Sequence, residues 1–519
     1  MADRLDSWKS IAAYLGREVR TVQRWAVSRR LPVHRLPGGN KPRVYALKPE
    51  LDGWLESGPS QAPAGAPSIA VLPFVSLGDE STEYFGDGLA DDIIDALVRV
   101  PGLRVIARTS SFAFRGQTRD VRAIGARLGA ANLLEGSIRC SGDRVRVSAQ
   151  LVSAADGCHL WSESYDRLLT DVFAVQYEIA QAIAGALDIR LSLETSCERP
   201  PGDLRAYALW LKGRAAAALY TAEGFGTAQE CYAAAIARDP RFAIPYVDAA
   251  EALINAATFG MTPSPDAARR ARELVLAALE LNESLGEAHA VRGSLEAVMG
   301  HDWRAAEASF QRAQELSPGS ASVLWRHAWY YLDPLGRIEE EVAEAREAAA
   351  RDPLSALTHS ILGLVLMVAR DYAGAAREQR LAVELAPGLA YPQWFLGTAL
   401  LLSGKLSEGF AQCRSVYERY GSDPMAVGGM SVVYALSLRR GKARALLSRL
   451  ESLTANTHVP PLAFAWAYLG LADDRVFDWL DRAIAEHDPA AIHMPSMPIY
   501  DAIRDDPRFG ALLAKMNLG

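Results

Sequence analysis

A regular spacing of prolines in the second half of the chain constrains the fold more than any other feature. Pro318, Pro353 and Pro387 each follow an alanine-rich segment of helical periodicity, and they lie 35 and 34 residues apart. A repeat of this length predicts stacked helical hairpins, because each unit can bury its apolar face only against its neighbours. We therefore predict an all-α solenoid over residues 203–519, with an insertion at residues 259–265.

The residues within one unit are similar to the tetratricopeptide repeat (TPR). Leu362, Gly363 and Leu366 fall on its first helix, and Ala375 and Ala382 fall on its second. Small residues at these positions let two helices approach closely, while large ones fill the groove of the next unit. The resemblance implies a TPR superhelix of six to eight helical pairs, with a protein partner on its concave surface. It also implies that the C-terminal segment caps the last apolar face.

Two clusters within the array have a structural and a functional interpretation. Trp325, Trp329, Tyr330 and Tyr331 fall at first-helix positions, where the array needs bulky residues. We therefore favour packing over a ligand cage for these aromatic side chains. Residues 339–341 are three consecutive glutamates, which we interpret as a solvated helix face.

Charge is divided unevenly along the chain. The whole sequence carries a net charge of −7. Residues 1–57 hold 11 Lys and Arg and 6 Asp and Glu, a net of +5. The remaining residues hold 55 − 11 = 44 basic and 62 − 6 = 56 acidic side chains, a net of −12. A basic head on an acidic body indicates a localised polyanion-binding site.

Several classes of protein are disfavoured by composition. The five cysteines are an odd number without a CxxC pair, which argues against a disulfide framework and a zinc site. The first residues, MADRLDSW, lack the apolar core of a signal peptide. The longest apolar runs are far below the ~18 residues that a membrane span needs. We predict a cytoplasmic protein with no membrane association, no metal and no cofactor.

The head, residues 1–57, reads in the order helix, helix, hairpin, helix. Asp6 or Ser7 can cap a helix that ends at Leu15, and residues 19–30 form a second, arginine-rich amphipathic helix. A Gly38-Gly39-Asn40 turn joins two short strands, and a final helix begins near Pro49. This order predicts a helix-turn-helix followed by a basic wing.

The head resembles the winged helix-turn-helix of the excisionase and MerR type. The similar stretches are SWKSIAAYLG, VRTVQRWAVSRRLPVHRL and KPRVYALKPELDGWL. The resemblance implies that the second helix enters the major groove of double-stranded DNA. The implied base contacts are Arg20, Thr21, Gln23 and Arg24, and the implied backbone contacts are Arg29, Arg30, Arg35, Lys41 and Arg43. The alternative is that these arginines form the solvated face of a small protein-binding domain.

A Pro-, Gly- and Ala-rich linker, residues 58–67, separates the head from a middle domain at residues 68–195. There we predict strands at SIAVLPFVSL and LRVIAR, a helix capped by Asp87, a helix at residues 121–128, a three-stranded meander and a helix at residues 172–191. The matching stretches IAVLPF, YFGDGLADDI and AIGARLGAANLLEGSIR resemble the TolB-amino-terminal-like domain. That domain occurs beside TPR repeats in bacterial regulators and in some class III adenylate cyclases. An α/β fold is therefore implied.

No catalytic constellation is visible in the sequence. Asp87, Asp91, Asp92 and Asp95 could suggest an acid/base or metal cluster, but we interpret them as helix-start carboxylates that suit the macrodipole. The catalytic domain of the cyclases has no visible counterpart, so we expect no enzyme. We predict a DNA-binding transcriptional regulator that receives its signal through the TolB-like and TPR regions and forms a homodimer through its body. The alternative is a TPR scaffold whose head does not bind DNA.

Overall fold

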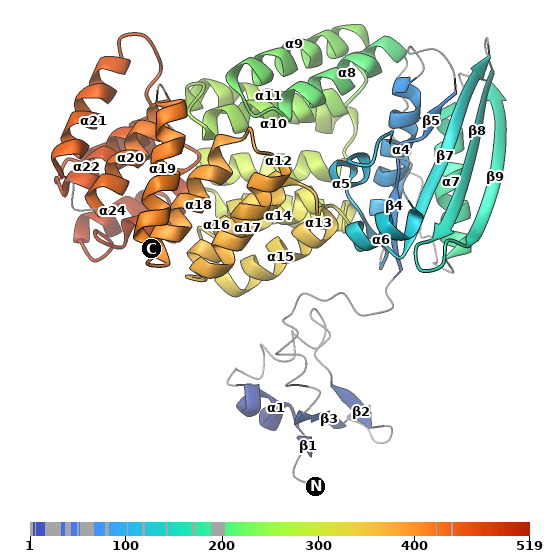
Figure 1. The fold of residues 1–519 in the computed structure, drawn as a ribbon, viewed down its shortest axis with the longest axis horizontal. Coiled ribbons are helices and arrows are strands. Elements are labelled where there is room, and N and C mark those ends of the chain that lie inside the picture. The colour runs from blue at the N-terminus through green and yellow to red at the C-terminus, as the bar shows by residue number, and fades with distance from the viewer. Residues whose placement is uncertain are drawn as a thin grey trace. The chain divides into compact units, whose positions relative to one another are not determined.

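The structure, a computed structural model, divides the chain into two compact units, residues 1–66 and 67–519. Figure 1 traces both. The described residues are 4–5, 7–15, 33–36, 43–48, 51, 67–77, 83–100, 102–116, 120–141, 144–168, 172–187, 203–421, 423–436 and 440–518.

The N-terminal unit contains the predicted first helix and both predicted hairpin strands. Helix α1 (Trp8–Leu15) begins after Ser7, whose hydroxyl accepts a hydrogen bond from the Ser10 amide at 3.1 Å. In return the Ser7 amide donates to the Ser10 hydroxyl at 3.0 Å, a reciprocal cap that satisfies two amide groups. Strand β3 (Arg43–Leu47) pairs with β2 (His34–Leu36) on one side and with β1 (Arg4–Leu5) on the other.

A small apolar core joins the helix to the sheet of this unit. Ile11 and Ala12 of α1 are buried together with Ala46 of β3 and Leu51. The segment predicted as the second helix, residues 19–30, lies outside the described residues, as does most of the predicted closing helix. The described part therefore has the helix and hairpin of the predicted head and leaves its central helix untested.

Residues 67–187 form an α/β part built on one mixed sheet. Its strands lie in the order β6-β4-β7-β8-β9, and β5 also pairs with β7. The strands β6, β4 and β7 are parallel, and β7, β8 and β9 form an antiparallel meander. The strands are β4 (Ser68–Val71), β5 (Val75–Ser76), β6 (Arg104–Val105), β7 (Asn132–Ser141), β8 (Arg144–Ser153) and β9 (His159–Leu168). The helices are α4 (Glu83–Val98), α5 (Arg108–Phe112), α6 (Val121–Leu128) and α7 (Val172–Ala186).

Helices cover both faces of the parallel strands. Ile69 and Val71 of β4 face a core shared with α4 and α7, whereas Ala70 faces a second core shared with α6. A strand that is buried on both faces needs a continuous apolar run, which explains the sequence SIAV. The predicted meander and the helix at residues 121–128 are confirmed.

Three predicted elements of the α/β part are wrong in detail. SIAVLPFVSL forms two short strands, interrupted around Pro73, because proline has no amide hydrogen for the ladder. LRVIAR contributes only the two residues of β6 before the chain turns into α5. Helix α4 begins at Glu83, four residues before the predicted cap Asp87.

Residues 203–518 form the predicted array, which within the described residues contains eight helical pairs. In the third and fourth pairs the first helix continues as a π-helix, Glu296–Gly300 and Ala328–Leu332, before the chain turns. This number agrees with the predicted six to eight, and the period gives the array the architecture of a TPR solenoid. The predicted insertion at residues 259–265 is only the turn between α10 and α11. The pairs are α8 (Leu204–Ala217) with α9 (Ala222–Arg238), α10 (Ile244–Thr258) with α11 (Ser264–Leu281), α12 (Gly286–Leu295) with α13 (Trp303–Leu316), α14 (Ala321–His327) with α15 (Ile338–Arg351), α16 (Ala356–Val368) with α17 (Tyr372–Leu385), α18 (Ala390–Leu402) with α19 (Leu406–Tyr420), α20 (Pro424–Leu436) with α21 (Arg440–Leu453), and α22 (Pro461–Leu471) with α23 (Val476–Ala485).

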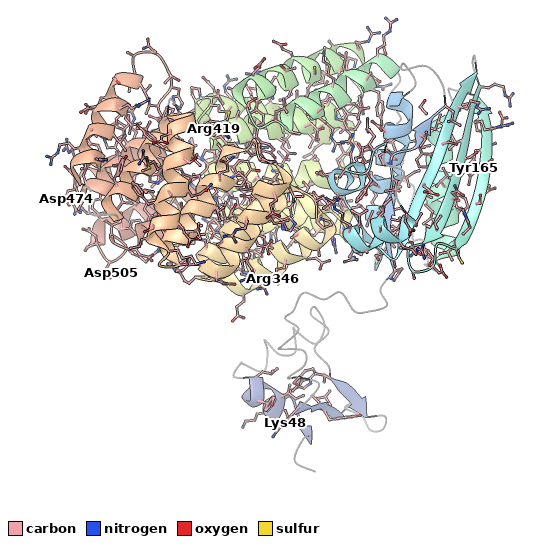
Figure 2. All side chains as sticks on the ribbon, in the orientation of Figure 1. Lys48, Tyr165, Arg346, Arg419, Asp474 and Asp505 are labelled. Atoms are coloured by element: carbon pink, nitrogen blue, oxygen red, sulfur yellow. The ribbon has the colours of Figure 1, made fainter. Side chains whose placement is uncertain are left out.

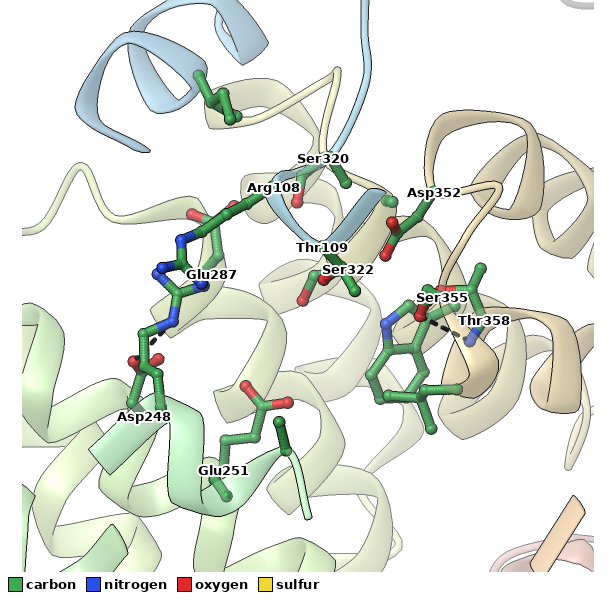
Figure 3. A pocket seen from close by; sticks show the side chains of 18 of the residues that line it. Arg108, Thr109, Asp248, Glu251, Glu287, Ser320, Ser322, Asp352, Ser355 and Thr358 are labelled. Carbon is green, nitrogen blue, oxygen red and sulfur yellow. Dashed lines mark hydrogen bonds and ion pairs between the residues drawn. The ribbon is translucent and has the colours of Figure 1, made fainter. Parts of the chain in front are cut away.

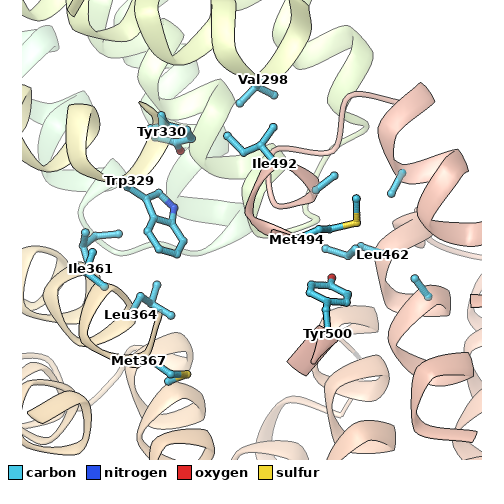
Figure 4. Packing of buried hydrophobic residues seen from close by; sticks show 14 of the residues in the cluster. Val298, Trp329, Tyr330, Ile361, Leu364, Met367, Leu462, Ile492, Met494 and Tyr500 are labelled. Atoms are coloured by element: carbon cyan, nitrogen blue, oxygen red, sulfur yellow. The ribbon is translucent and has the colours of Figure 1, made fainter. Parts of the chain in front are cut away.

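The C-terminal segment packs against α23 and also reaches back to earlier repeats. After α23 it forms two short 3-10 turns and α24 (Pro507–Lys515). The Trp303 indole donates to the Met516 carbonyl at 2.8 Å. His493 lies 2.5 Å from Asp333 and stacks on Trp329 with ring centroids 3.9 Å apart. Figure 4 shows apolar side chains of the middle repeats, such as Trp329 and Ile361, close to those of the C-terminal part, such as Ile492 and Tyr500. The segment therefore closes the array as well as capping its last pair.

The two interpretations of clusters in the array have different outcomes. Trp329, Tyr330 and Tyr331 are buried in the main apolar core, so packing is confirmed for them. The interpretation of residues 339–341 as a solvated face is wrong for Glu341, which is fully buried. Burial, with Asp333 nearby, raises the pKa of Glu341 to about 10, so this side chain is neutral at pH 7. The solvated charges of the array lie elsewhere, for example at Asp474 (Figure 2).

Two glycines explain how closely α4 approaches its neighbours. A Cβ atom at Gly86 would overlap the Phe74 carbonyl, and one at Gly88 would overlap the hydroxyl of Tyr207 on α8. Tyr207 is buried and packs on Trp210 with ring centroids 5.2 Å apart. The sequence Gly86-Asp87-Gly88 thus permits close packing of the α/β part against the first repeat.

Replacing Gly88 with alanine should destabilise residues 67–519. The added methyl group must displace the buried Tyr207 ring, and overpacking of this kind costs about 1–3 kcal/mol in free energy of unfolding. The measurement is denaturant-induced unfolding followed by tryptophan fluorescence. Gly226→Ala on α9 is the matched control, because its Cβ would meet nothing within 4 Å. Equal stability of the two variants would show that α4 and α8 do not pack as described.

Candidate functional site

The predicted DNA contacts fall mostly on the undescribed part of the head. Arg35 lies on β2 and Arg43 on β3, and the register pairs Arg35 with Val44 and Leu36 with Arg43. Two of the predicted phosphate contacts are therefore on neighbouring strands of one hairpin. The residues outside the described ranges are Arg20, Thr21, Gln23, Arg24, Arg29, Arg30 and Lys41.

A second candidate site is a pocket of about 520 Å³ between the α/β part and the concave side of the array. Helices α4 and α5 form one wall, and the first helices of five successive repeats form the rest. Figure 3 shows polar side chains from both parts facing this space. The pocket has no local signature in the sequence, because its lining residues come from segments more than 200 residues apart.

One carboxylate connects three helices at the α4 wall. Asp91 Oδ2 lies 2.6 Å from Arg214 Nη1 of α8 and 3.1 Å from Arg108 Nε of α5. The Asp91 side chain is only 4% exposed, so these arginines provide the compensation that a buried carboxylate needs. One turn earlier, Asp87 forms an ion pair with Arg115. Our interpretation of these aspartates as helix-start carboxylates is therefore wrong for Asp87 and Asp91.

Three carboxylates line the opposite wall on α10 and α12. Asp248 accepts a hydrogen bond from the Trp210 indole at 2.7 Å, and burial raises its pKa to about 6 despite Arg214 nearby. Glu251 forms an ion pair with Arg326, whose side chain is almost completely buried. Glu287 has a weaker partner, the Ser317 hydroxyl at 3.4 Å.

The third wall is formed by hydroxyl groups at the starts of α14 and α16. Ser320 caps α14, and Ser355 caps α16 by accepting from the Thr358 amide at 3.2 Å. Trp325 lies beside them in the lining of the pocket, although it is only 6% exposed. The packing prediction therefore holds for Trp325, and the residue also borders a ligand-sized space.

The α/β part is docked on the same turns. Ser110 of α5 donates from its hydroxyl to Asp352 Oδ1 at 2.6 Å and accepts from the Leu354 amide at 2.8 Å. The Ala107 amide donates to the Arg351 carbonyl at 2.8 Å. Burial raises the pKa of Asp352 to about 6, although hydrogen bonds from Ser110 and Ser355 act in the opposite direction.

The arrangement suits binding of a small polar molecule. Its volume is in the usual range of ligand sites, and charges of both signs line separate walls. Among the described residues, no three His, Cys, Asp or Glu side chains are grouped so that they could hold a metal ion. No helix of the described ranges is long and apolar enough to cross a bilayer.

Comparison with known proteins gives one close relationship over part of the chain. No family model matches the chain. A stretch of 162 residues is 46% identical to a protein of Rhizobium meliloti (strain 1021) named "Putative adenylate cyclase 3". The match covers 30% of the present chain and 27% of the relative, so the chain spans about a quarter of that relative's length.

Similarity to solved structures is weaker. A tetratricopeptide repeat protein from Parabacteroides merdae ATCC 43184 is 14% identical, with a TM-score of 0.35 over 52% of this chain and 98% of that protein. TolB from Acinetobacter baumannii is 18% identical, with a TM-score of 0.18 over 25% of this chain and 30% of that protein. TM-scores of this size do not establish a common fold.

The relative corrects one prediction from the sequence. We expected no enzyme, because no catalytic constellation was visible. A relative that shares 46% identity over 162 residues is named as an adenylate cyclase, so this prediction is wrong. The sequence contained a partial signal, because the middle stretches resemble a domain that also occurs in some class III adenylate cyclases.

The stability of the docked parts should fall as pH rises from 4 to 7. Asp352 has a folded pKa of about 6 and an ordinary value of 3.8, so the native state binds more protons than the unfolded state in this window. Asp352→Asn should remove on the order of 2 kcal/mol of this decline in free energy of unfolding. The measurement is chemical denaturation across the pH range. Asp266→Asn, on the exposed surface of α11, should keep the wild-type slope. Identical slopes in both variants would contradict the assigned environment of Asp352.

Proposed function

We propose that the chain is a DNA-binding transcriptional regulator, with the N-terminal unit as its DNA-binding part. The observation that carries this proposal is the charge division, +5 in residues 1–57 against −12 in the remainder. Phosphate neutralisation supplies most of the affinity for DNA, while an acidic body is repelled by it. Such a protein acts in the cytoplasm on double-stranded DNA.

The helix and hairpin of the head support this proposal. A hairpin with Arg35 and Arg43 on adjacent strands suits a wing that holds the DNA backbone, together with Arg29, Arg30 and Lys41. Residues 19–30 would then enter the major groove, where Arg and Gln side chains form bidentate contacts to guanine and adenine. In this arrangement Arg20, Thr21, Gln23 and Arg24 contact bases.

On this proposal the array and the α/β part receive the signal that controls DNA binding. TPR-type first helices line the concave side, which suits an extended segment of a protein partner. One head can neutralise only a few phosphates, so a homodimer would increase affinity for DNA. The alternative function, a scaffold whose head binds no DNA, needs the same array and differs only in the role of the N-terminal unit.

Two substitutions in the head should affect DNA binding in different ways. Binding sites are first selected from a random duplex library with the full-length chain. Arg24→Ala should then relax base preference at one position, because a lost bidentate contact removes about 1–3 kcal/mol of discrimination. Lys41→Ala should weaken binding to all sequences equally and reduce the salt slope by about 1. The measurement is fluorescence anisotropy at several salt concentrations.

Arg272→Ala serves as the control for charge alone, because Arg272 is exposed on α11 in the acidic body. It should leave affinity and salt slope unchanged. If the wild-type chain selected no sequence, or if its binding did not depend on salt, the scaffold alternative would replace the regulator. If Arg24→Ala and Lys41→Ala acted identically, the roles of helix and wing would be wrong.

A second candidate function is nucleotide cyclisation, and the 46% identity to the protein named as an adenylate cyclase favours it. On this proposal the purified full-length chain converts ATP to 3′,5′-cyclic AMP and pyrophosphate in the presence of Mg²⁺ or Mn²⁺. Liquid chromatography with mass spectrometry would detect the cyclic product. A heat-denatured sample of the same preparation controls for contamination by small molecules. Absence of product at every metal and ATP concentration tested would remove this candidate and leave DNA binding unaffected.

A further inference from the structure

We infer that the pocket between the α/β part and the array binds a basic amino acid, with its carboxylate toward Arg108 and its cationic groups toward Asp248 and Glu287. This site goes beyond DNA binding and beyond cyclisation, and it does not require either. Three observations carry it, which are the charge on each wall, the partners that these charges lack and the chemistry of the space between them.

The wall on α4, α5 and α8 has an excess of positive charge. Arg108 and Arg214 both pair with Asp91, and Arg214 also lies 3.7 Å from Asp248 on α10, so Asp91 is the only lining carboxylate on this wall that pairs with Arg108. Asp95 and Arg99 of α4 also line the pocket and add one charge of each sign. This wall therefore carries a net charge of +1.

Within that wall, Arg108 is the less satisfied of the two arginines. Its Nε atom is buried without a hydrogen-bond partner, because the 3.1 Å ion pair to Asp91 is not aligned as a hydrogen bond. Burial also lowers its pKa, and Asp91 does not offset that effect. The Phe112 ring stacks on the guanidinium at 4.3 Å and holds it at the edge of the pocket. A ligand carboxylate would supply the missing acceptor.

The wall on α10 and α12 has an excess of negative charge. Asp248, Glu251 and Glu287 are three carboxylates, of which Glu251 pairs with Arg326 and Asp248 lies 3.7 Å from Arg214, the arginine already counted on the opposite wall. This wall therefore carries a net charge of −2. Asp248 and Glu251 lie three residues apart on the same face of α10, and the charge of Glu251 contributes to the raised pKa of Asp248. A ligand cation would relieve this repulsion.

The space between the walls suits an aliphatic side chain with a polar end. Val291, Leu354 and Leu357 supply apolar surface, and Thr109 and Ser322 supply hydroxyl groups. Asp352 also faces the pocket, but its Oδ1 already accepts two hydrogen bonds from Ser110. With Asp352 included, six lining carboxylates face three lining guanidinium groups and Arg326, so the complementary ligand carries more positive than negative charge. A ligand with one carboxylate for Arg108 and two cationic groups meets this requirement. Lysine, arginine and ornithine have this charge pattern.

Isothermal titration calorimetry of the full-length chain with L-lysine and L-arginine tests the inference directly. Saturable binding of at least one of them is expected. Cadaverine lacks the carboxylate and Nα-acetyl-L-lysine lacks the α-ammonium group, so each should bind at least about tenfold more weakly than L-lysine. L-Leucine, which lacks the second cation, should also bind more weakly. All titrations are made at one ionic strength.

Substitutions in each wall test which charged group of the ligand that wall binds. Arg108→Gln should weaken L-lysine binding at least about tenfold and leave cadaverine binding unchanged, because only the carboxylate is affected. Glu287→Gln should weaken the binding of both ligands. Because Glu287 has only a long hydrogen bond to Ser317, this substitution should disturb the fold less than Arg108→Gln. Arg272→Gln and Glu280→Gln, both exposed on α11 and outside the pocket, should bind like the wild type.

Three results would overturn the inference. They are no binding of any basic amino acid at millimolar concentration, equal affinity for L-lysine and cadaverine, and equal weakening of both ligands by Arg108→Gln. Circular dichroism identifies a variant that does not fold, in which case the ligand series on the wild type decides alone. None of these results depends on DNA, so failure of the ligand site and failure of the DNA-binding proposal are separately visible.

Discussion

The carboxylate of Asp91 is the interaction on which the arrangement of residues 67–519 depends. It is nearly completely buried, and moving a carboxylate out of water is unfavourable unless cations and hydrogen bonds replace the solvent. Arg108 and Arg214 take the place of the solvent, and they come from two different segments, Arg108 from the α/β part and Arg214 from the first repeat. Because both arginines need the same anion, loss of this carboxylate would leave two cations facing each other. The α/β part and the array are therefore stable together as one unit.

The turns of the repeats complete this attachment. The Gly319 amide, which follows Pro318, donates to the Val98 carbonyl at 3.0 Å. One repeat later, Asp352 and the Arg351 carbonyl accept hydrogen bonds from Ser110 and Ala107. The proline-containing turns set the period of the array, and the α/β part binds to two successive turns. The spacing of the repeats is thus also the spacing of the docking contacts, so an insertion in one repeat would disturb both.

Elements that depend on neighbouring residues could be predicted from the sequence. The predictions were wrong where the environment of a side chain is set by residues distant in the chain. The 34-residue period and the helix at residues 121–128 are visible because periodicity and caps are local properties. Asp91 looked like one of several helix-start carboxylates, since nothing near it in sequence indicates Arg214, 123 residues away. Glu341 looked solvated beside two other glutamates, yet its side chain is fully buried with Asp333 nearby. The pocket could not be predicted for the same reason, because α4, α5 and the first helices of five repeats enclose it.

Without a ligand, the charge pattern of the pocket lowers the stability of the folded protein. A buried guanidinium atom without a hydrogen-bond partner and two neighbouring carboxylates on α10 each reduce stability, and apolar side chains could have filled the same space. Buried polar atoms without a hydrogen-bond partner also occur at Glu341 and Asp333, but neither of these residues lines the ligand-sized pocket. Unsatisfied charge that faces a ligand-sized cavity is typical of a functional site. A ligand that neutralises both walls would join α5 to α10 and α12, and so would strengthen the same attachment that Asp91 maintains.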